Sequence, residues 1–184
     1  MTMKKTLTIL TIAGVMTTGF LITNGKAETH SPSTTKSQTL AVDSETSKAL
    51  NRLEGALTLA EALNVEPISP IYQFNDVPAE YQGIVNALVD SGIVGPIADT
   101  HFGSEEALDR GETAIWINAG FSLPNANQSY EFTDVNALCT QDVANAFENG
   151  IIEPTGYDDT FGMFEEVTSE QLSLYLERAT SLFD

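Results

Sequence analysis

The feature that most constrains this chain is an internal repeat with a period of about 58 residues. The two copies share a Phe-x-Asp-Val start, a Gly-Ile pair and a Phe-Gly pair, and the offset grows from 58 to 59 before the last pair. Self-similarity at a fixed period indicates a repeat architecture, in which each unit buries its apolar face on its neighbours. The matched positions are Phe74, Asp76 and Val77 with Phe132, Asp134 and Val135, Gly92 and Ile93 with Gly150 and Ile151, and Phe102 and Gly103 with Phe161 and Gly162.

The N-terminus has the features of a secretory signal. Two lysines precede an almost uncharged run, Leu7 to Thr23, and small residues flank Lys26 at a cleavage site. We therefore predict a signal peptide at 1–27. An uncleaved membrane anchor is the alternative, although this run is short and is interrupted by glycine and threonine. Residues 28–44 are rich in serine and threonine and lack apolar periodicity, which predicts a flexible linker.

The chain is strongly acidic, with eight Lys and Arg against 26 Asp and Glu and a formal net charge of −18. Signal removal would take away three lysines and no acid, which leaves five cations and a charge of −21. Such a surface repels nucleic acid and anionic membranes, so we expect no nucleic acid binding and no membrane insertion after signal cleavage. Binding to any anionic polymer would therefore depend on local cations.

Apolar spacing predicts an all-α fold built from helix-loop-helix units. Residues 45–66 resemble the second half of a repeat and predict one helix, whereas 74–123 and 132–183 predict two full copies. In each full copy the first helix ends at a glycine, Gly92 or Gly150, that suits a left-handed cap. No stretch alternates for long enough to require a sheet.

Several side chains have expected places within these helices. We expect Pro78 in the first turn of its helix, Asp76 satisfying free amides there, and Tyr81 on the buried stripe. Cys139 is the only cysteine, which excludes an intramolecular disulfide, and a small buried apolar role is expected. Trp116 is expected in the core rather than on a sugar platform. We expect Leu172, Leu176, Ala179 and Leu182 to line the last helix.

The second helix of each unit begins with a capping box, which places an acceptor at the N-cap and Glu or Gln three residues later. The three boxes are Asn51 with Glu54, Asp109 with Glu112, and Thr168 with Gln171.

Two arginines follow these caps at a position where a cation opposes the helix dipole. Arg110 and Arg52, together with free backbone amides, would make an anion site for a carboxylate or phosphate. The alternatives are an ion pair with a nearby acid such as Glu105, and a helix that starts at Ser44 and leaves Arg52 on its surface. The third position carries Ser169, a neutral donor that should bind an anion weakly at most.

Together these motifs resemble the S-layer homology (SLH) domain. The resemblance rests on four motifs: the F-x-D-V-P start, the G-I-V turn, a loop similar to G-Y-x-D-x-T-F at 156–161, and diverged forms of V-T-R-A-E at 108–112 and 167–171. The resemblance implies repeats that pack as a pseudo-threefold helical bundle, with grooves that bind a pyruvylated secondary cell-wall polysaccharide noncovalently. It implies polymer binding by the motif arginine, which corresponds to Arg110 and Arg52 and is replaced at Ser169.

We therefore predict a secreted protein of the cell wall or cell surface that binds a cell-wall polysaccharide. The predicted polymer-binding residues are Arg110, Arg52, Glu112, Glu54 and Ser169, with the two glutamates and Gln171 shaping the site by capping. The alternative is an interaction module without wall binding, with a second copy of the chain or another envelope protein as its partner.

The sequence predicts no enzyme, no cofactor and no metal site. His101 is the only histidine outside the linker, and no nucleophile-base set is evident. Asp158 and Asp159 in a glycine-flanked loop suggest calcium, but their spacing is not that of an EF-hand.

Overall fold

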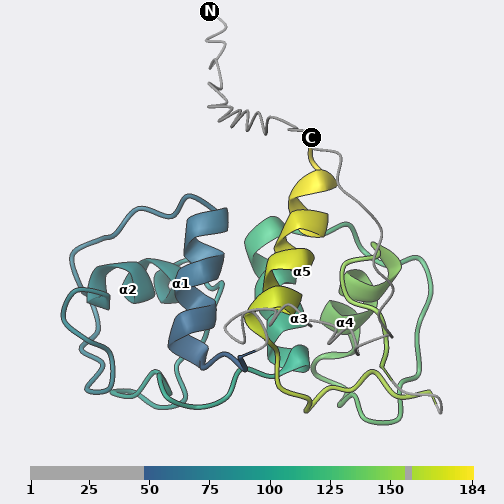
Figure 1. Ribbon diagram of the computed structural model, residues 1–184, viewed down its shortest axis with the longest axis horizontal. Helices are drawn as coiled ribbons and strands as arrows, with labels where there is room; N and C mark the ends of the chain where they lie inside the picture. Colours follow the sequence, from purple (N-terminus) through teal and green to yellow (C-terminus); the bar gives the residue numbers. More distant parts are fainter. Residues whose placement is uncertain (1–47, 156–158) are drawn as a thin grey trace, which may run out of the picture. The chain divides into compact units, whose positions relative to one another are not determined.

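The computed structural model describes residues 48–155 and 159–184, which form five α-helices and no strand (Figure 1). The helices are α1 (Arg52–Ala62), α2 (Gln82–Asp90), α3 (Arg110–Phe121), α4 (Thr140–Glu148) and α5 (Ser169–Ser181). The all-α prediction is confirmed for this part of the chain. The predicted signal peptide and linker lie outside the described residues. None of the five helices is long and apolar enough to cross a membrane.

The starts of α1, α3 and α5 follow the predicted caps. Asn51, Asp109 and Thr168 have extended backbones, and each side chain accepts a hydrogen bond from the amide three residues on. Since α1 begins at Arg52, the alternative of a helix already under way before this residue is wrong.

The first helices of the two copies start later than predicted. Because α2 begins at Gln82, Pro78 lies in the preceding turn, where its carbonyl accepts from the Tyr81 amide. Tyr81 occupies the N-cap and is 38% exposed, so its predicted place on the buried stripe was wrong. Cys139 has the equivalent position before α4 and is half-buried.

The predicted left-handed glycine caps are confirmed. Gly92 after α2 has φ +71°, and Gly150 after α4 has φ +70°. Side chains with a Cβ rarely adopt this conformation, so glycine allows the chain to turn sharply toward its loop.

Three short segments, one before each of α1, α3 and α5, are joined in a closed ring of backbone hydrogen bonds. The Leu108 amide donates to the Leu50 carbonyl at 2.9 Å, Val167 donates to Leu108 at 2.9 Å, and Leu50 donates to Val167 at 2.8 Å. All three side chains are buried. The ring therefore ties together segments that are about 58 residues apart in the chain, and the described part of the first unit enters it with one helix, α1.

The helices pack in two pairs, α1 with α2 and α3 with α4, whereas α5 contacts α1 and α3 but has no corresponding short helix beside it in the described residues. Ala56 and Ala114 are fully buried in α1 and α3, but the equivalent Ser173 in α5 is exposed. One turn further, half-buried Asn118 of α3 corresponds to exposed Glu177. The face of α5 that lacks a partner is therefore polar, and water can cover it in place of a helix.

The core is continuous across the three units. Trp116 is buried and stacks on Phe102 with ring centroids 6.3 Å apart, which confirms its predicted core role. Leu172, Leu176 and Ala179 are buried as predicted. Leu182 is 42% exposed, so its predicted core position was wrong, because it follows the last turn of α5 as the C-cap.

Candidate functional site

The aspartate of each Phe-x-Asp motif holds a loop in place rather than capping its own helix. The Asp76 carboxylate accepts from the amides of Phe102, Gly103 and Ser104 at 2.9, 2.7 and 2.8 Å. These amides lie 26 to 28 residues further along the chain. The prediction that Asp76 satisfies the amides of the next helix was therefore wrong, because the returning loop brings three donors to the carboxylate.

Asp134 repeats this arrangement in the second copy. It accepts from the amides of Phe161, Gly162 and Met163 at 2.7, 2.8 and 2.7 Å. Burial acts to raise the pKa of both carboxyl groups, but the backbone hydrogen bonds outweigh it and hold each pKa below the ordinary value of 3.8. Each loop is thereby fastened beside the helix start of a neighbouring unit.

The lowered pKa values predict a loss of stability in acid. Because the folded pKa lies below the unfolded one, the stabilisation is complete above the unfolded pKa and is lost as the pH falls through the folded pKa. We expect the difference in melting temperature between wild type and Asp134→Asn to shrink between about pH 6 and about pH 2.5. A difference that is equal at both pH values would show that the charge of Asp134 does not hold the loop.

Arg52 and Arg110 are buried, with exposed fractions of 5% and 2%. Arg52 donates to the carbonyls of Gly95 at 2.6 Å and Phe102 at 3.0 Å, and its guanidinium lies 5.0 Å from the Phe102 ring centroid. It also forms an ion pair with Glu112. Each arginine therefore joins the start of one helix to the loop of the following unit.

Arg110 makes the same kind of contacts with a loop as Arg52 does. It donates to the Tyr175 hydroxyl at 2.7 Å and to the Phe161 carbonyl at 3.1 Å, and it also contacts the Glu153 carbonyl. No ion pair of Arg110 occurs in the described residues, so the alternative of pairing with Glu105 is wrong. Its Nε atom is buried, and no hydrogen-bond partner for it is found among the described residues.

The capping boxes are complete in α1 and α5 and incomplete in α3. Glu54 and Gln171 each accept from the backbone amide of their N-cap residue. Glu112 does not, because its carboxylate pairs with Arg52 instead. The predicted capping role of Glu112 was therefore wrong, since a cation from another unit outcompetes the local amide.

Ser169 occupies the third equivalent helix start. Its amide donates to the Lys48 carbonyl at 3.2 Å, as the Arg52 amide donates to Glu106 at 2.8 Å. The Lys48 ammonium contacts Glu54 at 2.8 Å. The structure thus groups the predicted residues into three places: Arg52 with Glu112, Arg110 near Gln171, and Ser169 near Glu54 through Lys48.

Two equivalent hollows lie beside the arginines. The first, of about 380 Å³, is lined by Arg52, Gly95, Pro96, Glu112 and Trp116 among others. The second, of about 260 Å³, is lined by Arg110, Glu153, Pro154, Thr155, Gln171, Leu174, Tyr175 and Arg178. Arg178 and Tyr175 were not predicted as site residues. Their spacing of three on one helix was the available signal, but its meaning depends on a loop that packs against this helix.

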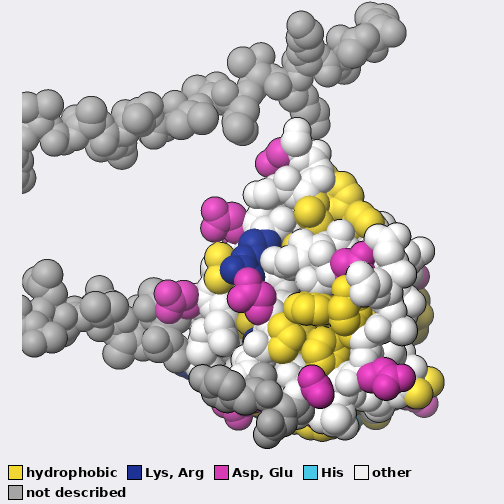
Figure 2. Space-filling view, turned by 90° about the vertical axis from the view of Figure 1, so that its right-hand side faces the viewer, with side chains coloured by type: hydrophobic (Ala, Val, Ile, Leu, Met, Phe, Trp, Pro, Cys, Tyr) yellow, Lys and Arg dark blue, Asp and Glu magenta, His cyan; other side chains and the backbone are white. Residues whose placement is uncertain are grey.

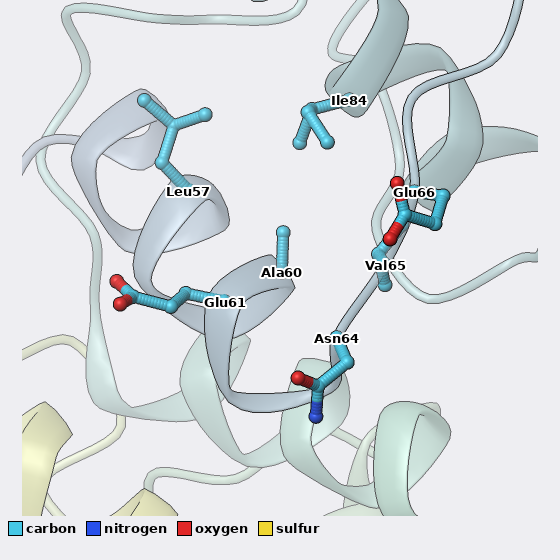
Figure 3. A pocket seen from close by; sticks show the side chains of 7 residues that line it. All are labelled: Leu57, Ala60, Glu61, Asn64, Val65, Glu66 and Ile84. Atoms are coloured by element: carbon cyan, nitrogen blue, oxygen red, sulfur yellow. The ribbon is translucent and has the colours of Figure 1, made fainter.

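A third hollow, between α1 and α2, does not suit an anion. It measures about 320 Å³, and its lining includes Leu57, Ala60 and Ile84 together with Glu61 and Glu66 (Figure 3). Two carboxylates without a cation in the lining would repel an anionic ligand. The described residues also contain no cluster of three or more His, Cys, Asp or Glu that could hold a metal ion, and Asp158 of the suggested calcium loop lies outside them.

The fold and the hollows define a helical repeat protein whose units are joined by buried arginines. Comparison with known families finds the S-layer homology domain at residues 73–114. The chain therefore contains an SLH domain, which spans α2, the following loop and the start of α3. No curated protein matches the chain.

An SLH domain implies anchoring of a surface protein to the cell wall, and thus a location in the cell envelope. No catalytic family is found.

Proposed function

We propose that the chain attaches noncovalently to a pyruvylated secondary cell-wall polysaccharide after export and removal of residues 1–27. The single observation that carries this proposal is the buried Arg110, which lines an open hollow and forms no ion pair in the described residues. An isolated buried cation is unfavourable, and a ligand carboxylate in the hollow would compensate its charge.

The arrangement of the units supports the proposal. The closed ring through Leu50, Leu108 and Val167 is what a pseudo-threefold bundle of two repeats and a half requires. In such a bundle the hollows lie between units, where a polymer chain can contact side chains from two of them. The proposed polymer-binding set remains Arg110, Arg52, Glu112, Glu54 and Ser169.

The chain as a whole repels an anionic polymer, because its net charge is −18 before processing. Attachment would therefore depend on short-range contacts, and salt would strengthen it or leave it unchanged by screening the overall repulsion. Attachment through a positively charged surface would instead weaken steeply with salt.

Co-sedimentation with purified cell walls tests the proposal. We expect the wild-type protein to pellet with untreated walls and to remain in the supernatant after chemical removal of the pyruvate ketals, because the ligand carboxylate is then lost. Asp99→Asn, which removes an exposed charge outside both arginine hollows, is the control and should pellet like wild type. Equal pelleting on treated and untreated walls would contradict the proposed ligand and favour a protein partner.

A further inference from the structure

The two arginine hollows differ in one respect that decides whether they can take an anion. In the first hollow, Arg52 and Glu112 form an ion pair whose side chains are only 6% and 22% exposed. The positive charge of Arg52 is therefore already compensated within the protein. A ligand carboxylate entering this hollow would meet Glu112, which carries the same charge as the ligand.

In the second hollow, the neutral residues Gln171 and Tyr175 occupy the positions that Glu112 and Trp116 have in the first. Gln171 corresponds to Glu112, and its carbonyl oxygen is engaged by the Thr168 amide. Tyr175 corresponds to Trp116 and accepts from Arg110. The charge of Arg110 thus has no acidic partner in the described residues, and its buried Nε lacks a hydrogen bond.

Arg178 supplies the accessible cation of this second hollow. Its side chain is 33% exposed and donates to the Ile151 carbonyl at 3.0 Å. Its other terminal nitrogen lies 3.6 Å from the Glu153 carboxylate, which is 72% exposed. An exposed ion pair of this kind contributes little, so a ligand carboxylate can replace Glu153 at small cost. Figure 2 shows the side of the molecule that carries α4, where one patch of basic surface lies beside acidic and apolar surface.

We propose that the chain binds one carboxylate-bearing sugar, in the hollow lined by Arg110, Tyr175 and Arg178, and that Glu112 closes the hollow at Arg52 to anions. This inference rests on the proposed wall attachment and locates the binding of the polysaccharide in the hollow at Arg110. The exposed guanidinium of Arg178 would contact the carboxylate in a forked arrangement. Pro154 and Leu174 offer apolar surface to the methyl group of a pyruvate ketal, and Thr155 offers a hydroxyl to the sugar.

Calorimetric titration with the methyl glycoside of a pyruvylated hexosamine, and with its methyl ester, tests the assignment. We expect wild type to bind one equivalent of the acid and to prefer it to the ester. Arg178→Gln should weaken acid binding by roughly tenfold or more and reduce the preference for the acid, because a charge-assisted contact is lost. Arg178→Lys should bind with an intermediate affinity, because it keeps the charge and loses the fork.

If Arg178 had a purely structural role, Arg178→Gln would weaken the binding of the acid and of the ester equally, and the preference for the acid would stay as in wild type. Undiminished acid binding by Arg178→Gln, with that preference unchanged, would overturn the inference. If wild type nevertheless pellets with untreated walls in the co-sedimentation experiment, the proposed function stands and only the assignment to this hollow fails. If wild type neither binds the acid nor pellets with walls, the proposed function itself fails.

Glu112→Gln tests the role of Glu112 by creating a second binding site. The substitution gives the first hollow a glutamine, as Gln171 does in the second hollow. With the charge of Arg52 released, we expect the number of acid equivalents bound to rise from one to two. Two equivalents already bound by wild type, or one equivalent bound by a variant that melts like wild type, would overturn the role given to Glu112. If this variant does not fold, the Arg178 series decides the location of the site by itself.

Discussion

Asp134→Ala is expected to lower the free energy of unfolding by about 3 kcal/mol and to be among the most damaging single substitutions in this protein. The carboxylate accepts from three backbone amides of the loop at Phe161, Gly162 and Met163. Alanine offers no acceptor, so the amides must find water or remain unpaired, and the loop that also carries the Phe161 carbonyl beside Arg110 loses its anchor.

Chemical denaturation monitored by circular dichroism measures this effect. Asp99→Ala is the matched control, because Asp99 is exposed and none of the hydrogen bonds or ion pairs found in the described residues involves it; it should change the stability by less than about 0.5 kcal/mol. Asp76→Ala should behave like Asp134→Ala, since Asp76 makes the equivalent three bonds. A loss at Asp134 no larger than the control would show that water replaces the carboxylate without cost.

Leu108→Ala is expected to destabilise the fold by about 3 kcal/mol, and the melting temperature should fall by roughly 10 °C. Leu108 is fully buried and belongs to the ring that joins the three units. Its side chain fills its site tightly, because a Cβ placed on Gly55 would lie only 2.4 Å from the Leu108 Cδ2 atom. Truncation therefore leaves a cavity where three units meet, and the surrounding residues cannot close it without moving a helix.

The same substitution leaves the backbone ring able to form, so it separates side-chain packing from hydrogen bonding. Leu138→Ala is the control of equal chemistry, because Leu138 is 92% exposed and its truncation leaves no cavity. If the two leucine variants unfold at the same denaturant concentration, the three units do not depend on packing at the ring.

Local rules predicted the features whose partners lie within a few residues. The N-caps at Asn51, Asp109 and Thr168, and the left-handed turns at Gly92 and Gly150, depend only on neighbouring backbone groups. The repeat itself was also evident, because matched residues recur at a nearly constant offset. The S-layer homology domain found at 73–114 covers most of the first full copy, 74–123.

The same rules failed where a distant partner competes with a local one. Glu112 fits a capping box, yet Arg52, 60 residues earlier, takes its carboxylate. Asp76 fits a helix cap, yet the loop at Phe102 to Ser104 supplies three better-placed amides. Glu112 gains a full cation in this way, and Asp76 gains three amides at once, so each distant partner outweighs the single amide that the local pattern offers.

The sequence by itself determined the repeat, which segments are helical, and the N-caps of α1, α3 and α5, because these depend on spacing and on contacts within a turn or two. Only the tertiary structure decided which arginine is neutralised, since that choice depends on whether Glu112 or Gln171 stands opposite it across the boundary between units. It also decided that Arg178 belongs to a hollow with Arg110, because the loop residue Glu153 that links them is brought there by folding. Charges separated by 60 residues in sequence interact only when packing places them together.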